Sequence, residues 1–400
     1  MEILHIENLN FRYPKAEKDT LHNISLNIGQ GDFTVICGAT GCGKTTLLKL
    51  IKNELAPAGE KSGEILYNGK SIDSLGLRES ACAIGFVGQN PDNQIVTDKV
   101  WHELSFGLEN LGVPQNVIRR RVGEMASYFG IQDWFRKKTD ELSGGQKQLL
   151  NLASVMVMQP KVLILDEPTS QLDPIAAADF IATLKKLNTE FGITVLLVEH
   201  RLEDVFPIAD KVLLMENGCV LLYDSPRAVG KNLKKINPEH PMLKGLPSAV
   251  RLYNLLSSDE VCPLTVKEGQ EFFRRNFKRN IDFSDGDKSE YSDKTDMAIE
   301  LKNVWFRYER DLPDILRGVN LKVYRGEIIC ILGGNGTGKT TMLNVISGLN
   351  KPYRGKIKID GKKIKDYKGN SLYRKKLAYL PQNPQTVFLK DTVSDRKSVV

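Results

Sequence analysis

The chain has 400 residues, of which 41% are hydrophobic, and this suits two or three packed domains of ordinary globular composition. The formal net charge is +7. All of the positive excess lies after residue 297, where no aromatic stacking platform accompanies the lysines, so we expect a solvated surface and no nucleic-acid partner. No apolar run approaches the roughly 18 residues that span a bilayer, and the start of the chain lacks a signal-peptide pattern, so the sequence predicts a cytosolic protein.

The first motif is a glycine-rich loop at residues 38–45, with the sequence GATGCGKT. This GxxxxGK[ST] pattern describes a loop that holds nucleotide phosphates, with Mg²⁺ on the final hydroxyl. Glycines permit the tight turn, and a helix predicted from Lys44 to about residue 53 would point its positive end at the same anion. The predicted ATP-binding residues of the loop are Gly38, Gly41, Gly43, Lys44, Thr45 and Thr46.

Short strand-like runs surround this loop, at residues 3–9, 33–36, 63–69 and 83–87. Tyr13 lies between the first two runs, where an aromatic ring can stack on adenine, although a lone tyrosine more often belongs to a core. Gln89 follows the run at 83–87. Because α/β sheets bind their ligands at the carboxyl ends of strands, we expect Gln89 to lie at the ligand-binding edge. It is a candidate catalytic residue and a candidate Mg²⁺ ligand.

Residues 98–154 have a helical pattern, which predicts an inserted helical subdomain. Near its end stands the sequence LSGGQ at 142–146, followed by a helix predicted from Lys147. Two glycines before a helix can form a second phosphate-sized nest, but an ordinary N-cap by Ser143 explains them equally well. The candidate residues are Ser143, Gly144, Gly145 and Gln146.

An apolar run at 162–165 is followed by Asp166 and Glu167, which predicts a buried parallel strand that presents two carboxylates. Such a pair is costly unless Mg²⁺·ATP compensates its charge. We predict that Asp166 binds Mg²⁺ together with Thr45, and that Glu167 deprotonates the attacking water. Asp173 ends a turn at 170–173, and His200 follows a strand at 193–198, from which it can contact a γ-phosphate.

The glycine-rich pattern returns at residues 333–340 as GGNGTGKT, after an apolar run at 328–332 that we predict to be a strand. The surrounding residues repeat in one register, which indicates two tandem copies of one nucleotide-binding domain. The candidate ATP-binding residues of the second copy are Tyr308, Gly333, Asn335, Gly336, Gly338, Lys339, Thr340, Thr341 and Gln382.

In this order, these motifs resemble the ATP-binding cassette family over residues 1 to about 230. The resemblance implies an α/β fold of the P-loop NTPase type, with a RecA-like parallel or mixed sheet, an antiparallel β subdomain and a helical subdomain. It also implies ATP and Mg²⁺ as ligands, ATPase activity, and a D-loop at Asp173.

Residues 88–114 and 198–218 are similar to the ATPases of energy-coupling factor transporters, and residues 245–275 are similar to their C-terminal extension. This resemblance implies a peripheral location on the cytoplasmic face of the membrane. The implied partners are integral-membrane coupling and substrate-binding subunits of an importer for vitamins, Co²⁺ or Ni²⁺.

We therefore expect a complete cassette at 1–232, an extension and polar linker at 233–297, and a truncated second cassette at 298–400. The family holds each ATP between the P-loop of one cassette and the LSGGQ of another. The second copy contains no LSGGQ, paired acids or histidine within the sequence, so neither site is complete in one chain. The hypothesis is that hydrolysis requires a second copy of the chain or another ATPase domain.

Two alternatives remain open. Ribosome-associated translation factors also carry tandem cassettes, but long charged helices join them, whereas residues 231–297 here contain four prolines. The other alternative is a catalytically incomplete nucleotide-binding fragment.

Overall fold

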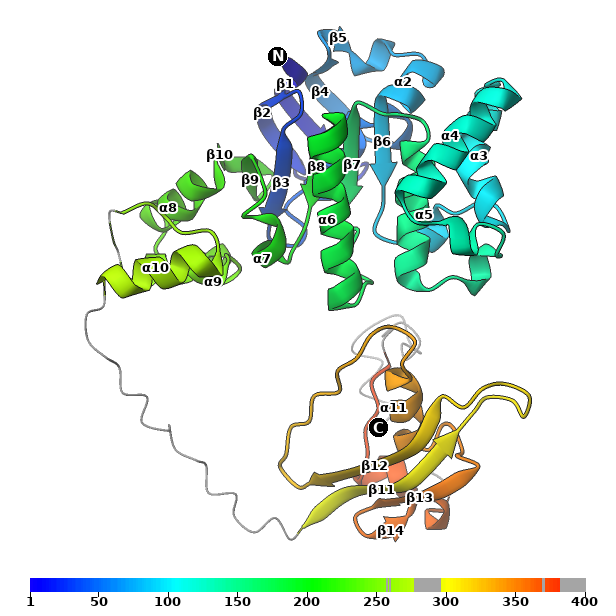
Figure 1. Cartoon of the computed structure of the whole chain (residues 1–400). Helices are drawn as coiled ribbons and strands as arrows, with labels where there is room; N and C mark the ends of the chain where they lie inside the picture. Colours follow the sequence, from blue (N-terminus) through cyan, green and yellow to red (C-terminus); the bar gives the residue numbers. More distant parts are fainter. Residues whose placement is uncertain (257, 259, 277–295, 369–370, 382–400) are drawn as a thin grey trace. The chain divides into compact units, whose positions relative to one another are not determined.

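The computed structural model describes all residues except 257, 259, 277–295, 369–370 and 382–400 (Figure 1). The chain forms two compact units, Met1–Asn280 and Ile281–Val400. In the described ranges, no helix combines the length and the apolar character required to cross a membrane.

A six-stranded sheet forms the centre of the first unit, with the strand order β10-β9-β3-β8-β7-β6. All neighbours pair in parallel except β9 and β10, which are antiparallel. Every residue of β3, β7 and β8 is buried, as expected for a parallel sheet covered on both faces. The strands are β3 (Phe33–Gly38), β6 (Ile84–Val87), β7 (Val162–Asp166), β8 (Thr194–Val198), β9 (Lys211–Glu216) and β10 (Cys219–Asp224).

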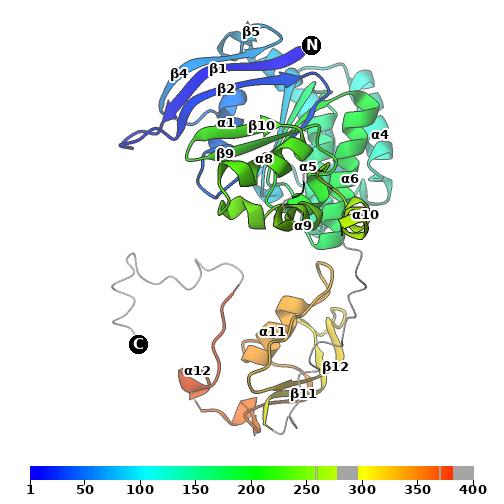
Figure 2. The ribbon, with the colours of Figure 1, turned by 90° about the vertical axis from the view of Figure 1, so that its left-hand side faces the viewer.

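A second, antiparallel sheet of the first unit has the order β2-β1-β4-β5 (Figure 2). Its strands are β1 (Glu2–Arg12), β2 (Leu21–Gly29), β4 (Glu60–Tyr67) and β5 (Lys70–Ser71). Asn68 and Gly69 join the last two with positive φ angles of 47° and 76°, the conformation that an Asn-Gly hairpin turn requires. The strands predicted at 3–9 and 63–69 are confirmed, with shifted limits.

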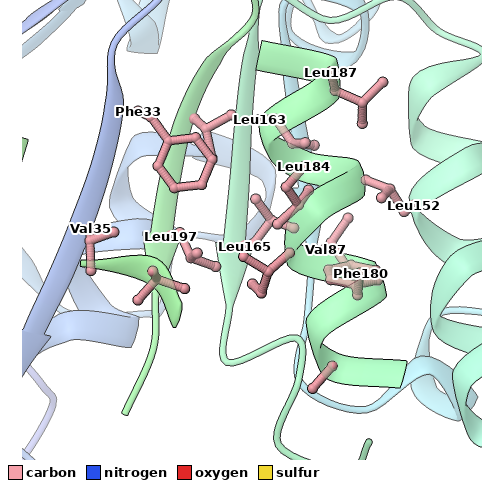
Figure 3. Close-up of a cluster of buried hydrophobic side chains, with 14 of the residues drawn as sticks. Phe33, Val35, Val87, Leu152, Leu163, Leu165, Phe180, Leu184, Leu187 and Leu197 are labelled. Atoms are coloured by element: carbon pink, nitrogen blue, oxygen red, sulfur yellow. The ribbon is translucent and has the colours of Figure 1, made fainter. Parts of the chain in front are cut away.

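Helices cover the central sheet and form the predicted helical subdomain. Phe180, Leu184 and Leu187 of α6 pack toward Leu163, Leu165 and Leu197 of the strands (Figure 3). The helices are α1 (Lys44–Ile51), α2 (Leu77–Ala83), α3 (Val100–Asn110), α4 (Gln115–Tyr128), α5 (Gly144–Met156), α6 (Pro174–Phe191) and α7 (Leu202–Val205).

Three further helices, α8 (Pro226–Ile236), α9 (Ser248–Leu256) and α10 (Val266–Asn276), belong to the same unit. Arg227 of α8 donates two hydrogen bonds to the Glu268 carboxylate of α10, both 2.9 Å long. It also donates to the carbonyl of Cys262 at 2.6 Å. The predicted cassette boundary at residue 232 lies inside α8, and the position of that boundary stays a prediction.

The second unit contains an antiparallel sheet of order β12-β11-β13-β14. The strand predicted at 328–332 is wrong: the structure has no strand there, and Ile328 is 98% exposed. A strand requires hydrogen-bonding neighbours; β3 pairs with β8 and β9, whereas no described strand pairs with 328–332. The elements are β11 (Met297–Phe306), β12 (Leu316–Tyr324), α11 (Lys339–Ser347), β13 (Arg354–Ile359), β14 (Lys362–Lys363) and α12 (Ser371–Lys375).

The Arg227–Glu268 pair predicts how stability depends on pH. The Arg227 guanidinium holds the pKa of Glu268 below its ordinary value of 4.5. A depressed carboxyl pKa contributes stability above the ordinary pKa, and this contribution is lost as the pH falls through the folded-state value. Glu268→Gln therefore lowers the Tm at neutral pH, and the difference from the wild type narrows in acid.

Thermal unfolding followed by circular dichroism between about pH 3 and pH 7 measures this difference. Glu271→Gln, which changes an exposed glutamate of the same helix, is the control. A pH-independent difference for Glu268→Gln would contradict the prediction.

Candidate functional site

The first glycine-rich loop joins β3 to α1, and its backbone conformation requires glycine. Gly38 has a φ of 147°, and a Cβ atom there would lie 2.2 Å from the carbonyl oxygen of Met215. Gly43, which precedes α1, has a φ of 101°, and its Cβ would lie 2.7 Å from Leu21. Lys44 begins the helix, as predicted, and its ammonium donates 2.9 Å hydrogen bonds to the carbonyls of Gly38 and Ala39. The lysine charge is therefore held at the loop.

The second loop repeats this local geometry in its own unit. Gly333, Gly336 and Gly338 have φ angles of 153°, 78° and 90°, close to the 147°, 83° and 101° at the corresponding positions of the first loop. Lys339 starts α11 and donates to the carbonyls of Gly333 and Gly334 at 2.8 and 2.6 Å. Both loops thus adopt the same backbone and lysine arrangement.

The two predicted adenine-stacking tyrosines also make matching contacts. The hydroxyl of Tyr13 lies 3.0 Å from that of Thr46, and the hydroxyl of Tyr308 lies 3.2 Å from that of Thr341. Both tyrosines are exposed, Tyr13 by 37% and Tyr308 by 57% of the residue surface. The adenine role of both stays a prediction, and Gln382 lies outside the described residues.

Thr45 and Asp166 meet at the carboxyl edge of the sheet. The Thr45 hydroxyl donates to Oδ1 of Asp166 at 3.1 Å. Burial raises the pKa of Asp166, and the nearby charge of Glu167 raises it further. A hydroxyl and a carboxylate fit Mg²⁺, which usually takes one or two protein oxygens and completes its shell with phosphate oxygens and water. Among the described residues, no group of three or more His, Cys, Asp or Glu side chains is placed to hold a metal ion.

Glu167 contacts the other two predicted catalytic residues, Gln89 and His200. Gln89 donates its amide N–H to Oε2 of Glu167 at 3.2 Å, and Nε2 of His200 lies 2.8 Å from Oε1. The backbone of Glu167 has a φ of 49°, a conformation that non-glycine residues rarely adopt. Hydrogen bonds from its N–H to Val198 and from Ser170 to its carbonyl maintain this conformation. Gln89 therefore contacts the predicted base, and its predicted role as a Mg²⁺ ligand stays untested.

Within the LSGGQ segment, Ser143 is the N-cap of α5. The Ser143 hydroxyl accepts the N–H of Gln146 at 3.2 Å, and the Gln146 side chain accepts the N–H of Ser143 at 3.0 Å. This capping box starts α5 at Gly144, so the helix start predicted at Lys147 is wrong by three residues. Gly144 and Gly145 lie inside the first turn, and their binding of a phosphate stays a prediction.

The predicted D-loop residue Asp173 also caps a helix. Its carboxylate accepts the N–H groups of Ile175 and Ala176 at 3.1 and 3.0 Å. This contact starts α6 directly before Pro174, a favoured first helical residue.

One acidic residue of the site, Glu199, lies at the predicted strand end before His200, but the sequence analysis assigned it no role. Glu199, at the end of β8, is only 4% exposed, and it accepts the hydroxyl and N–H of Thr169 at 2.6 and 3.2 Å. Burial raises the pKa of Glu199. Its position directly before His200 was a usable signal. Its contact with Thr169 holds the loop that follows Glu167.

The parallel sheet has a glycine-rich loop after β3 and paired acids at the end of β7, and β8 lies between these two strands. This arrangement defines a P-loop nucleotide-binding cassette. Comparison with known proteins agrees with this class. The ABC transporter family pattern matches residues 21–170 and 316–398. The chain is 41% identical over 390 residues to a predicted ABC transporter ATP-binding protein of Bacillus thuringiensis subsp. konkukian, covering 98% of the chain and 69% of that relative. The chain therefore belongs to the ABC transporter family.

Further relatives and solved structures have the same character. A predicted ABC transporter ATP-binding protein of Methanosarcina acetivorans is 33% identical, over 98% of the chain and 66% of that relative. CbiO1 of Clostridium perfringens, part of the ABC transporter complex CbiONQ, superposes with a TM-score of 0.54 at 35% identity, covering 64% of this chain and 99% of that chain. The ATP-binding cassette MJ0796, dimeric and bound to ADP and Pi, gives a TM-score of 0.50 at 25% identity, covering 56% of this chain and 99% of that chain.

The site predicts distinct roles for its two neighbouring glutamates. Glu167→Gln removes the candidate base, and we expect ATP turnover to fall about 10²–10⁴-fold while ATP binding persists. Glu199→Gln keeps an acceptor for Thr169 and retains most of the turnover. Steady-state phosphate release and binding of a fluorescent ATP analogue measure the two effects. A larger loss of turnover in Glu199→Gln than in Glu167→Gln would contradict the assignment of Glu167 as the base.

Proposed function

We propose that this chain is an ATP-binding and ATP-hydrolysing subunit that energises a membrane importer of the energy-coupling factor type, for vitamins, Co²⁺ or Ni²⁺. The observation that carries the proposal is the contact of Glu167 with both Gln89 and His200, at the edge of the sheet where Lys44 begins its helix. The similarity to CbiO1, named as part of a transporter complex, supports the importer class.

In the proposed reaction, water attacks the γ-phosphate in line with the leaving oxygen. Bound Mg²⁺ would supply charge neutralisation at the phosphates, held by Thr45 and Asp166. Lys44 neutralises charge from the loop, Glu167 accepts the proton of the attacking water, and His200 and Gln89 orient the Glu167 carboxylate.

We also propose that the first site is completed by a partner cassette that supplies Ser143 and the signature glycines. The comparison with the dimeric cassette MJ0796 supports this arrangement. A second copy of this chain, or another ABC ATPase domain, can supply that partner. The repeated loop geometry around Lys339 supports the proposal that residues 298–400 belong to a second cassette.

The proposed membrane partner docks on the helical subdomain, on the cytoplasmic face of the membrane. A groove between α3 and α4 combines an exposed tryptophan with apolar and charged side chains, which suits a short amphipathic helix of a coupling subunit. Its lining includes Trp101, Glu109, Val113, Ile118, Arg119 and Phe135. Neither a ribosome-associated factor nor an inactive fragment has a specific observation in its favour.

The proposed function predicts that ATP hydrolysis by the purified chain rises faster than linearly with protein concentration, because two chains must meet to complete a site. Glu167→Gln provides the blank. With ATP, the same variant is expected to elute as a dimer on size-exclusion chromatography, because ATP is bound and not consumed.

Ser143→Arg in the Glu167→Gln background is the matched control, and it should remain monomeric because the bulky cation blocks the signature. Turnover at the blank level at every concentration, together with a monomer in ATP, would contradict the proposed function for this chain alone.

A further inference from the structure

Both backbone polar groups of Gly88, the residue before Gln89, are bound by side-chain amides. The N–H of Gly88 donates to Oε1 of Gln94 at 2.5 Å, and its carbonyl accepts the Nε2 amide of Gln148 at 3.1 Å. Gly88 lies outside any helix or strand, because β6 ends at Val87. These two amides therefore determine where the backbone leads into Gln89.

Both amides that bind Gly88 are connected to α5: Gln148 lies on this helix, and Gln94 is hydrogen-bonded to it. Gln148 lies on α5 and is 0% exposed, and Asn151, one turn further along, is 3% exposed. Asn151 donates to the same Oε1 of Gln94 at 2.7 Å. The Nε2 group of Gln94 donates to the carbonyl of Phe86 at 3.2 Å, which determines the orientation of that amide. We call Gln94, Gln148 and Asn151 the amide clamp.

Core packing alone does not explain why residue 148 is a glutamine. Its Oε1 is buried and has no hydrogen-bond partner in the part of the chain that the structure describes. Burying an unpaired amide oxygen is unfavourable, and an apolar side chain of similar size would avoid that cost. The one side-chain hydrogen bond described for Gln148 goes to Gly88. That bond is therefore the reason for an amide at this position.

An ion pair also connects α5 to the segment that follows Gln89. Nζ of Lys147, also on α5, lies 2.6 Å from Oδ1 of Asp92, in the turn that follows Gln89. The residues that begin α5 are the signature Ser143 to Gln146, and Gln89 contacts Glu167. Hydrogen bonds on either side of the Gly88–Gln89 peptide thus connect the signature helix to the candidate base.

We infer that the amide clamp consists of positioning residues. Gln148 directly, and Asn151 through Gln94, hold the Gly88 backbone and thereby place Gln89 beside Glu167. The inference rests on the proposed function for its link to turnover.

Hydrogen–deuterium exchange of the full-length chain tests the clamp without turnover. Gln148→Met removes the donor to Gly88 and keeps the volume, and we expect at least several-fold faster exchange in peptides that contain Gly88 and Gln89. Asn188→Leu is the matched control, because Asn188 is also buried and donates to two backbone carbonyls, of Gly31 and Ile193, away from this loop. Exchange at Gly88 and Gln89 that is unchanged in Gln148→Met, or equally fast in Asn188→Leu, overturns the inference.

A double-mutant cycle tests the link to turnover. We expect Gln148→Met to lower kcat several-fold with little change in KM, and to have little further effect in a Gln89→Ala background. Fully additive losses would overturn the positioning role. If the wild-type chain hydrolyses no ATP at any concentration, the proposed function fails, and the exchange experiment alone then decides the clamp.

Discussion

Three carboxylates, those of Asp166, Glu167 and Glu199, are crowded at the ends of the neighbouring strands β7 and β8. Burial raises the pKa of Asp166 and Glu199, and the charge of Glu167 contributes to both shifts. The surrounding structure compensates each acid separately: Thr45 donates to Asp166, Thr169 donates to Glu199, and Gln89 and His200 contact Glu167. The loops of the site are arranged around this concentration of negative charge.

The backbone at Glu167 adds a second constraint. Its positive φ turns the carboxylate away from the line of β7, and this conformation persists because the surrounding hydrogen bonds over-determine it. One of those bonds runs to Val198 of β8, so the position of the candidate base depends on the pairing of two strands that are 28 residues or more apart in sequence. The sheet thereby connects the acid to His200, which follows the same strand β8.

The two glycine-rich loops separate local from tertiary causes. Both have the same φ pattern and the same lysine contacts with loop carbonyls, so the loop sequence is sufficient for this conformation. Their supports differ. β3 is a buried central strand between β8 and β9. In contrast, the apolar run at 328–332 has no described strand beside it, and Leu332 is 85% exposed. Apolar composition therefore predicts a strand only when neighbours supply the hydrogen bonds.

The sequence by itself was sufficient for the α/β cassette fold, the P-loop, the strand before Asp166 and the helical subdomain, because glycine spacing and hydrophobic runs act locally. It misplaced the start of α5, because the capping box of Ser143 and Gln146 incorporates both glycines into the helix. It assigned no role to Glu199, Gln94 or Gln148. Their roles arise from contacts between segments 6 to 60 residues apart, and only the tertiary structure brings those buried polar groups within hydrogen-bonding distance.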